Sequence, residues 1–328
     1  MQYKNNLASL LKKALVGLTV GALFIYLTLR QIDIENSIQY IRNANIYWII
    51  LPALFYFSIF ILRAWRWQML LSHVKKIELF KLFKLLFIGF LMNILLPFRI
   101  GELVRANLTG KKTAVPRTGV LASIVSERVF DGVIIVLLFC ITMFSMPIPQ
   151  WAIKSLYAGS SAFIAGIVIL FVIARKKEVA VKIFSKLPIH LKFVEKLEDL
   201  FIKFINSLEI FSSISLIVKV FSISLVIWIM EGLVFYMITN AFNIHLGLMQ
   251  CFLVIIIIGM GAALPTAPGG IGTFEFLGVL VLSFLGIDKN IAFGYLLTIH
   301  FIQLTTLVSC GIVSLIAEKV TLGELIKV

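Results

Sequence analysis

Two breaks in otherwise apolar segments constrain the fold of this chain most. Residues 96–102 and 264–275 each interrupt a hydrophobic run with proline, pass through glycine and end on a carboxylate. Backbone that faces lipid must keep its hydrogen bonds within a helix or a closed barrel, so such breaks persist at membrane depth only where protein buries them or they line a wet cavity. Paired breaks at corresponding places in two halves of a chain are typical of inverted-repeat transporters, whose substrate site lies at the breaks.

Composition places the chain among polytopic membrane proteins. Hydrophobic residues make up 60%, charged residues 14%, and the mean hydropathy is +1.04, whereas charged residues are about 25% of a soluble chain. The net charge of +14 does not indicate nucleic acid as a partner, because the basic residues lie between hydrophobic segments, as topology signals do. Cys140, Cys251 and Cys310 stand singly, which argues against a disulfide framework or a zinc site. We expect no cofactor and no metal.

Six stretches are long and apolar enough to cross a bilayer as helices, which needs roughly 20 residues. They are 12–29, 46–63, 118–145, 154–174, 213–240 and 291–317.

The segments around the two breaks are shorter. We expect 80–96 with 100–112, and 250–264 with 272–286, to form two re-entrant helical hairpins that enter and leave on the same side. The expected fold class is therefore an all-α polytopic membrane protein with about six full transmembrane helices and two re-entrant hairpins. Seven or eight full crossings without hairpins is the alternative.

The distribution of lysine and arginine predicts the topology. Most of the 30 basic residues fall inside if the chain starts in the cytoplasm, and both termini are then cytoplasmic in the cell membrane. Residues 1–328 are read as one domain of two pseudo-repeats, about 1–150 and 151–328, with opposite orientations. The hydrophilic stretch 175–212 has apolar residues at helical spacing, which indicates an amphipathic helix on the membrane surface or a docking or dimer helix.

Ionisable residues inside spans usually mark function. Glu127, Arg128 and Asp131 lie in the third predicted span, where Arg128 reaches Asp131 one turn away. They form either a structural ion pair or part of a substrate site. Glu231 in the fifth span has no basic residue within one turn, so it is either protonated or paired with a group from another helix. For Glu231, the sequence supports a structural role as much as a role in proton coupling or substrate contact.

Further basic residues stand near the first break. Arg63 and Arg66, at the end of the second span, are either interfacial anchors or contacts for lipid phosphate through their guanidinium groups. Arg99, Glu102 and Arg105 follow the break. Glu102 and Arg105 share one face of a helix whose N-terminus favours an anion, so this segment is a candidate cradle for a lipid headgroup.

The second break has no basic residue. Backbone amides of Gly269 and Gly270, just before Glu275, can do similar work there. The glycines lack the G-x-G-x-x-G spacing of a dinucleotide site. His300 in the last span either lines the cavity or, as we favour, hydrogen-bonds to another helix.

Taken in chain order, the motifs resemble those of the lysylphosphatidylglycerol synthase transmembrane family, the flippase-like domain that also occurs alone. The matching positions are Arg63, Arg66, Trp67, Asn93, Pro97, Arg99, Gly101, Glu102, Arg105, Glu127, Arg128, Asp131, Pro265, Pro268, Gly269, Gly270, Gly272 and Glu275. The resemblance covers nearly the whole chain and implies two re-entrant hairpins and, in the best-understood members, transfer of an aminoacylated phospholipid to the outer leaflet. It also suggests a homodimer.

The resemblance favours a transporter over an enzyme. Bifunctional members carry a soluble domain that aminoacylates the lipid, whereas this chain ends at Val328, so we expect a different lipid as cargo, either a phospholipid or a polyprenyl-phosphate lipid. The alternatives are an intramembrane transferase acting on a lipid-linked phosphate or sugar, with Glu127, Asp131 or Glu231 as acid or base, and a scaffold acting through 175–212. The expected substrate-binding residues are Arg63, Arg66, Asn93, Arg99, Glu102, Arg105, Glu127, Arg128, Asp131, Glu231, Gly269, Gly270 and Glu275.

Overall fold

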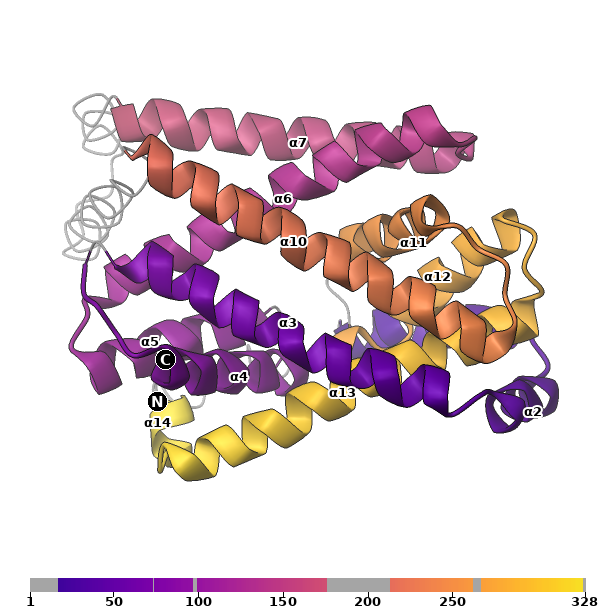
Figure 1. The fold of residues 1–328 in the computed structure, drawn as a ribbon, viewed down its shortest axis with the longest axis horizontal. Helices are drawn as coiled ribbons and strands as arrows, with labels where there is room; N and C mark the ends of the chain where they lie inside the picture. Colours follow the sequence, from indigo (N-terminus) through magenta and orange to yellow (C-terminus); the bar gives the residue numbers. More distant parts are fainter. Residues whose placement is uncertain (1–16, 73, 97–98, 176–212, 262–266, 327–328) are drawn as a thin grey trace.

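A computed structural model of the chain describes residues 17–72, 74–96, 99–175, 213–261 and 267–326. All regular structure in these ranges is helical, and no strand occurs in them. The predicted all-α fold class is therefore confirmed. The helices form an elongated bundle in which α3 (Tyr47–Leu71) and α10 (Ile214–Thr239) pack along each other (Figure 1).

The long helices lie where the spans are predicted. Besides α3 and α10 they are Gly17–Leu29, α6 (Arg117–Ser145), α7 (Gln150–Arg175) and α13 (Lys289–Ala317). By length and composition, three are suited to cross a membrane in the described part, namely α3, α13, and α10 continued through the 3-10 turn η3 (Asn240–Phe242). A fourth is added if Gly17–Leu29 and α2 (Ile34–Asn43), bent by 85°, count as one span. The six predicted spans are thus confirmed in part.

The first break joins two helices that pack as a hairpin. Helix α4 (Leu79–Leu95) lies against α5 (Gly101–Thr113). A Cβ atom at Gly101 would lie 2.3 Å from the Gly89 carbonyl oxygen, and one at Gly89 would lie 2.9 Å from the Arg105 Cβ atom. A Cβ atom at Gly101 would also lie 2.5 Å from the Asn93 backbone nitrogen. Asn93 is thus near Gly101 and Gly89 is near Arg105, so the two helices pack antiparallel, with glycine at the closest approach. Pro97 lies outside the described residues.

The second break also lies between two packed helices. Helix α11 (Leu248–Gly261) contacts α12 (Thr273–Phe284), and the short 3-10 turn η4 (Pro268–Gly270) precedes α12. Three glycines in this break, Gly269, Gly270 and Gly272, have φ values of 71°, 75° and 88°, which non-glycine residues rarely adopt. Glycine is therefore a conformational requirement here. Pro265 lies outside the described residues.

The two breaks meet inside the bundle. Turn η4 packs on α4, and a Cβ atom at Gly269 would lie 3.7 Å from the Ile94 side chain and 3.4 Å from that of Leu304. The hairpins α4–α5 and α11–α12 extend from this point toward opposite ends of the molecule (Figure 1). Helix α13 contacts both α4 and α12, so it links them.

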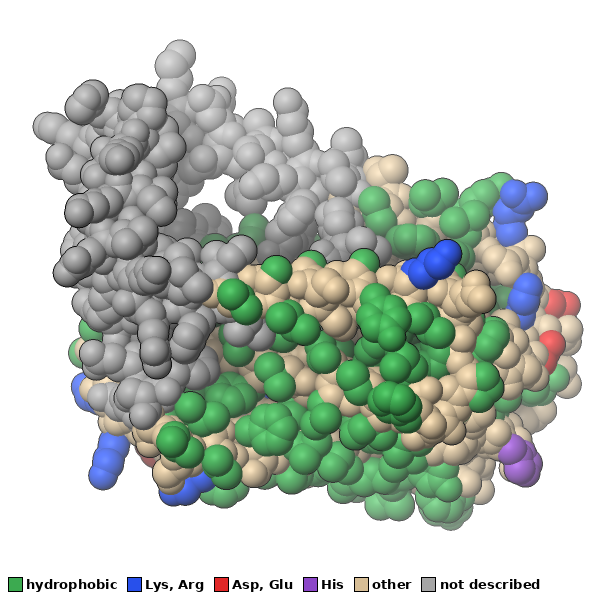
Figure 2. Space-filling view, turned by 90° about the horizontal axis from the view of Figure 1, so that it is seen from above, with side chains coloured by type: hydrophobic (Ala, Val, Ile, Leu, Met, Phe, Trp, Pro, Cys, Tyr) green, Lys and Arg blue, Asp and Glu red, His purple; other side chains and the backbone are tan. Residues whose placement is uncertain are grey.

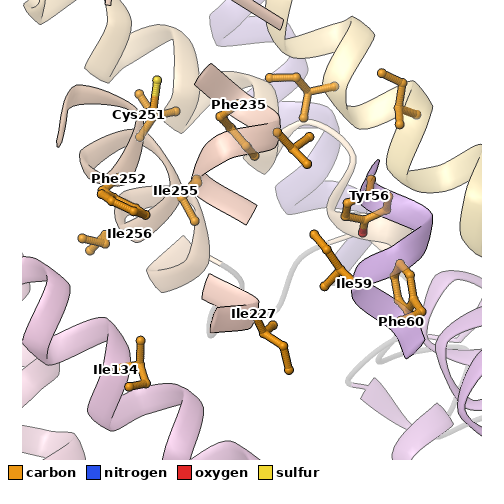
Figure 3. Packing of buried hydrophobic residues seen from close by; sticks show 14 of the residues in the cluster. Tyr56, Ile59, Phe60, Ile134, Ile227, Phe235, Cys251, Phe252, Ile255 and Ile256 are labelled. Carbon is orange, nitrogen blue, oxygen red and sulfur yellow. The ribbon is translucent and has the colours of Figure 1, made fainter. Parts of the chain in front are cut away.

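Apolar packing holds the helices around this point. Ile59 and Phe60 of α3, Ile227 and Phe235 of α10, and Phe252 of α11 are buried members of one hydrophobic cluster (Figure 3). The outside is apolar as well, since hydrophobic side chains cover much of the face in Figure 2 and most of the visible charged side chains lie toward its ends. An apolar exterior suits lipid contact.

Two features fall outside the predicted scheme or outside the described residues. Helix α2 was not predicted. Its N-cap is Asp33, whose side chain accepts hydrogen bonds from the amides of Glu35 and Asn36, and its polar and apolar residues lie on separate faces. The segment 176–212, predicted as an amphipathic connector, lies outside the described residues. The last helix is α14 (Leu322–Ile326).

Candidate functional site

Four arginines and four carboxylates lie where α3, α5, α6 and α10 meet and form three neighbouring ion-paired groups, together called the network. The arginines are Arg63, Arg66, Arg105 and Arg128, and the carboxylates are Glu102, Glu127, Asp131 and Glu231. All eight are predicted site residues. Equal numbers of opposite charges make the network neutral as a whole, which is how buried charges are tolerated away from water.

Arg66 and Asp131 lie at the centre of this network. Arg66 Nη1 donates to Asp131 Oδ1 at 2.6 Å and to Ser224 Oγ at 2.9 Å, and Arg66 Nη2 lies 3.3 Å from Asp131 Oδ2. The Trp228 indole N–H also donates to Asp131 Oδ1, at 3.2 Å. The Arg66 side chain is 1% exposed. Its charge is therefore matched by protein groups from α6 and α10.

Arg63 lies one turn before Arg66, and its ion-pair partner lies on α10 rather than on α6. Its Nη2 donates to Glu231 Oε1 at 2.8 Å, and the two side chains are 15% and 10% exposed. Of the two states predicted for Glu231, the structure shows pairing with a group from another helix. This pair is more accessible than the pair formed by Arg66 and Asp131.

Arg105 forms the most enclosed pair. Its Nη1 and Nη2 atoms lie 2.8 and 3.3 Å from the two carboxylate oxygens of Glu127, and these side chains are 3% and 2% exposed. The guanidinium also covers the Trp67 ring, and the Trp67 N–H donates to Ser123 Oγ at 3.0 Å. The close approach of α4 at Gly89 completes this enclosure.

Arg128 connects the hairpin to the rest of the network. Its Nε lies 3.1 Å from Glu102 Oε1, and its Nη1 lies 3.4 Å from Asp131 Oδ2. The predicted contact with Asp131 one turn away is confirmed. Glu102 and Arg105 both face α6, but they pair with Arg128 and Glu127 there rather than with each other. The Arg128 and Glu102 side chains are 33% and 23% exposed.

Arg99 differs from these four arginines. It is exposed, has a left-handed φ of 54°, and makes no ion pair or hydrogen bond within the described ranges. Its charge interacts with those of Arg128, Glu102 and Asp131, so it lies at the edge of the network. Nearby, Asn93 Oδ1 is buried without a hydrogen-bond donor among the described residues.

The second break is held by a separate polar cluster. Glu275 Oε2 accepts from the Gly272 N–H at 2.7 Å, and Glu275 Oε1 lies 2.5 Å from His300 Nδ1. His300 Nε2 lies 3.0 Å from the Gly269 carbonyl oxygen. The expectation that His300 hydrogen-bonds to another helix is confirmed. The Gly270 amide donates to the Ala267 carbonyl and is used within the turn.

The structure also reveals a basic groove that the sequence does not disclose. A groove of about 400 Å³ lies between the start of α4 and the end of α5. Five lysines line it, namely Lys75, Lys76, Lys81, Lys111 and Lys112. Lys75 Nζ and Lys81 Nζ donate to the carbonyls of Thr113 and Lys112, which stabilises the end of α5. From the sequence, these lysines are predicted only as topology signals between apolar segments. That they line one groove depends on how the α4–α5 hairpin folds, which the alternation of basic and apolar segments does not give.

No group of three His, Cys, Asp or Glu side chains suited to a metal ion occurs in the part of the chain that the structure describes.

Comparison with known families shows to which family these motifs belong. The family model described as lysylphosphatidylglycerol synthase TM region matches residues 14–311. The chain belongs to this family. The matched range includes both breaks and every arginine and carboxylate of the network. Together with its apolar helices, membership makes the chain a multi-pass membrane protein.

Curated relatives are archaeal. A UPF0104 membrane protein of Methanocaldococcus jannaschii is 27% identical over 240 residues, which cover 71% of this chain and 97% of that protein. A UPF0104 membrane protein of Methanothermobacter thermautotrophicus is 22% identical over 281 residues, covering 79% of this chain and 81% of that protein. No solved structure matches the chain.

Proposed function

We propose that the chain is a lipid translocase that moves a phospholipid or a lipid-linked phosphate between the leaflets of the cell membrane. In this proposal six helices span the bilayer, the α4–α5 and α11–α12 hairpins are re-entrant, and both termini are cytoplasmic. The observation that carries it is the position of Arg99, an exposed arginine without an ion pair in the described part, beside a neutral charge network at the first break.

The network defines which arginines are available to an anionic headgroup. Arg66 and Arg105 are buried and matched by Asp131 and Glu127, so their role is to position the helices around the site. Arg99 adds an unmatched positive charge at the edge of the network. A guanidinium is well suited to bind a phosphate through two parallel hydrogen bonds. A headgroup phosphate bound to Arg99 therefore neutralises the positive charge that Arg99 adds to the network among the described residues.

The remaining site residues differ in their exposure, and the proposal assigns their roles accordingly. The Arg63–Glu231 and Arg128–Glu102 pairs are partly exposed, so their carboxylates can bind a cationic part of a headgroup and their guanidiniums can bind phosphate. Asn93, Gly269, Gly270 and Glu275 belong to the region where the two breaks meet. A homodimer stays a prediction.

Two surface features support a lipid as the substrate. The exterior carries large exposed apolar side chains, such as Phe144 at 85% and Phe301 at 70%, against which acyl chains can remain in the bilayer. The basic groove at the base of the first hairpin attracts anionic headgroups. Each basic residue near a membrane surface contributes about 1 kcal/mol to the free energy of binding to anionic lipid.

Reconstituted protein tests the proposal. Proteoliposomes carrying fluorescent phosphatidylglycerol are treated with a membrane-impermeant quencher, and the rate at which inner-leaflet probe becomes quenchable is measured. Arg99→Ala should slow this rate about tenfold or more, because a hydrogen bond to a charged group contributes roughly 1.5–3 kcal/mol. Arg42→Ala, which removes an exposed arginine of α2, is the matched control and should keep the wild-type rate.

Three outcomes would change the proposal. Equal rates in Arg99→Ala and wild type would remove Arg99 from the site. A wild-type rate equal to that of protein-free vesicles, for neutral and anionic probes alike, would contradict translocation. A chemically altered probe lipid, seen by chromatography, would favour the intramembrane transferase.

A further inference from the structure

Both ring nitrogens of His300 face an oxygen atom. Nδ1 lies 2.5 Å from Glu275 Oε1, and Nε2 lies 3.0 Å from the Gly269 carbonyl oxygen. A carbonyl oxygen only accepts hydrogen bonds, so Nε2 must carry a proton. An ionised carboxylate also only accepts, so the short contact at Nδ1 needs a proton as well, on either Nδ1 or Glu275.

The proton count of the pair follows from these contacts. A histidinium with an ionised Glu275, and a neutral His300 with a protonated Glu275, each hold two protons on the two side chains. With one proton, two acceptors would face each other at one of the two contacts. A buried acceptor without a donor costs about 1–3 kcal/mol. The contact that joins α12, η4 and α13 is therefore favoured only while the pair holds its second proton.

The surroundings leave the pair isolated from other charges. The His300 and Glu275 side chains are 6% and 8% exposed, and the Phe274 ring stacks on the imidazole at 4.3 Å. Glu275 Oε2 is occupied by the Gly272 N–H. Within the described ranges, no other ionisable side chain forms an ion pair or hydrogen bond with either residue.

Neighbouring elements confirm this isolation. The helix Gly17–Leu29, which approaches Gly272 at Gly21, contains no Asp, Glu, Lys, Arg or His. On α4, Lys84 pairs with Glu318 and Lys81 binds the Lys112 carbonyl, at the end far from the break. The buried Cys251 is the titratable residue of α11. The second proton is thus shared by Glu275 and His300 alone in the described part.

We propose that Glu275 and His300 form a proton-binding site whose occupancy holds the second hairpin against α13. Gly269, which supplies one of the acceptors, also lies at the point where the two breaks meet. Release of the proton therefore weakens the second break at Gly269, the residue through which this break contacts α4 of the first hairpin. The wider role rests on the proposed function: in a lipid translocase, this proton is the coupled ion.

Reversible unfolding in mixed micelles at a series of pH values tests the site. A free histidine loses its second ring proton near pH 6.5 in water, whereas the folded pair keeps two protons. The unfolded state thus binds fewer protons above about pH 6.5, and the folding equilibrium constant should fall up to tenfold per pH unit there. A constant that does not change between about pH 6.5 and 8.5 would overturn the proposal.

A matched pair of variants isolates the contribution of the pair. In Glu275→Gln, the amide NH2 can donate to Nδ1 of a neutral His300, the amide oxygen can accept from Gly272, and Nε2–H can still donate to Gly269. All contacts are kept without the titrating proton, so the fall above about pH 6.5 should be lost. His245→Gln removes an exposed histidine and should retain the wild-type slope. A wild-type slope in Glu275→Gln would overturn the proposal.

A second measurement does not depend on the stability of a variant. Nitrogen-15 NMR of histidine-labelled wild-type protein follows the protonation of each imidazole, and a single His→Gln replacement assigns each signal. The His300 signals should show one proton on Nε2 and a second proton in the hydrogen bond between Nδ1 and Glu275 Oε1. Absence of the proton between Nδ1 and Glu275 would overturn the site.

Transport measurements distinguish a failure of the proton site from a failure of the proposed translocase function. A pH gradient across proteoliposomes should alter the wild-type lipid rate at least about twofold, and Glu275→Gln should lose this response. A wild-type rate that ignores the gradient, with the unfolding and NMR results intact, would overturn coupling but keep the proton site. Absence of any wild-type transport would contradict the translocase, and the unfolding and NMR results would still decide the proton site.

Discussion

The guanidinium carbon of Arg105 lies 3.5 Å from the centroid of the Trp67 ring. The same guanidinium holds both carboxylate oxygens of Glu127. One side chain of α5 therefore binds α3 through an aromatic face and α6 through a bidentate ion pair. A desolvated cation–π contact contributes about 2 kcal/mol, so Arg105 anchors the first hairpin to the bundle through two different helices.

Replacing Arg105 tests this anchor. Arg105→Ala should lower the free energy of unfolding by about 3–5 kcal/mol, because it leaves the Glu127 carboxylate buried without its partner. Reversible unfolding in mixed micelles measures the loss. The double variant Arg105→Met with Glu127→Gln removes both charges and should recover much of it. A double variant no more stable than Arg105→Ala would show that the ion pair is not the source of the loss.

Two carboxylates of the network should differ in their contribution to stability. Asp131 accepts from Arg66 and Trp228 and also contacts Arg128, whereas Glu231 is held by Arg63 in a more exposed pair. Asp131→Asn should therefore destabilise the protein by roughly 3–5 kcal/mol and Glu231→Gln by about 1–3 kcal/mol. The comparison is made by the same unfolding assay, and an equal or reversed order would contradict it.

The close approach of α4 and α5 should not tolerate a methyl group. In Gly101→Ala the new Cβ would lie 2.3 Å from the Gly89 carbonyl oxygen, so the helices must separate. Increased hydrogen exchange in 101–113 and a loss of roughly 1–3 kcal/mol are expected. Gly259→Ala is the control, because nothing lies within 4 Å of its Cβ position and alanine favours a helix by up to about 1 kcal/mol. Exchange in 101–113 that stays at the wild-type level in Gly101→Ala would contradict the close packing.

The end of α13 should hold the first hairpin. Glu318 follows α13 and pairs through its side chain with Lys84, while its carbonyl oxygen accepts from Lys112 at 3.0 Å. Glu318→Gln removes the ion pair alone and should raise hydrogen exchange in the first turns of α4, with a stability loss of up to about 1 kcal/mol for this partly exposed pair. Glu324→Gln, which affects a local contact with Thr321, should leave α4 unchanged. Raised exchange in both variants would indicate a general charge effect instead.

Much of the helical layout is readable from the sequence because bilayer crossing imposes it. Apolar length sets the spans, and proline with glycine sets the breaks. Helix α5 begins at Gly101, one residue from the predicted start. Helix α2 was missed because ten residues between spans give a weak signal, although Asp33 is a recognisable N-cap.

The pairings within the site were less accessible to sequence reasoning. The need of Glu231 for a partner follows from its burial in a span, but Arg63 lies 168 residues away, and no periodic pattern relates the two. Arg105 and Glu127 face each other only because the first hairpin folds back onto α6. Spacing along one helix predicts contacts such as Arg128 with Asp131, whereas contacts between helices require the packing angles.

Helix α13 is shared by both hairpins. Near its middle His300 binds the second break, Gly311 lies against Leu91 of α4, and the residue after its last turn binds Lys84 and Lys112. A straight helix of 29 residues is about 44 Å long. A tilt of about 10° around its midpoint would move its two ends by roughly 4 Å in opposite directions. Because α13 contacts both α4 and α12, a displacement of this one helix changes the contacts of both hairpins at the same time.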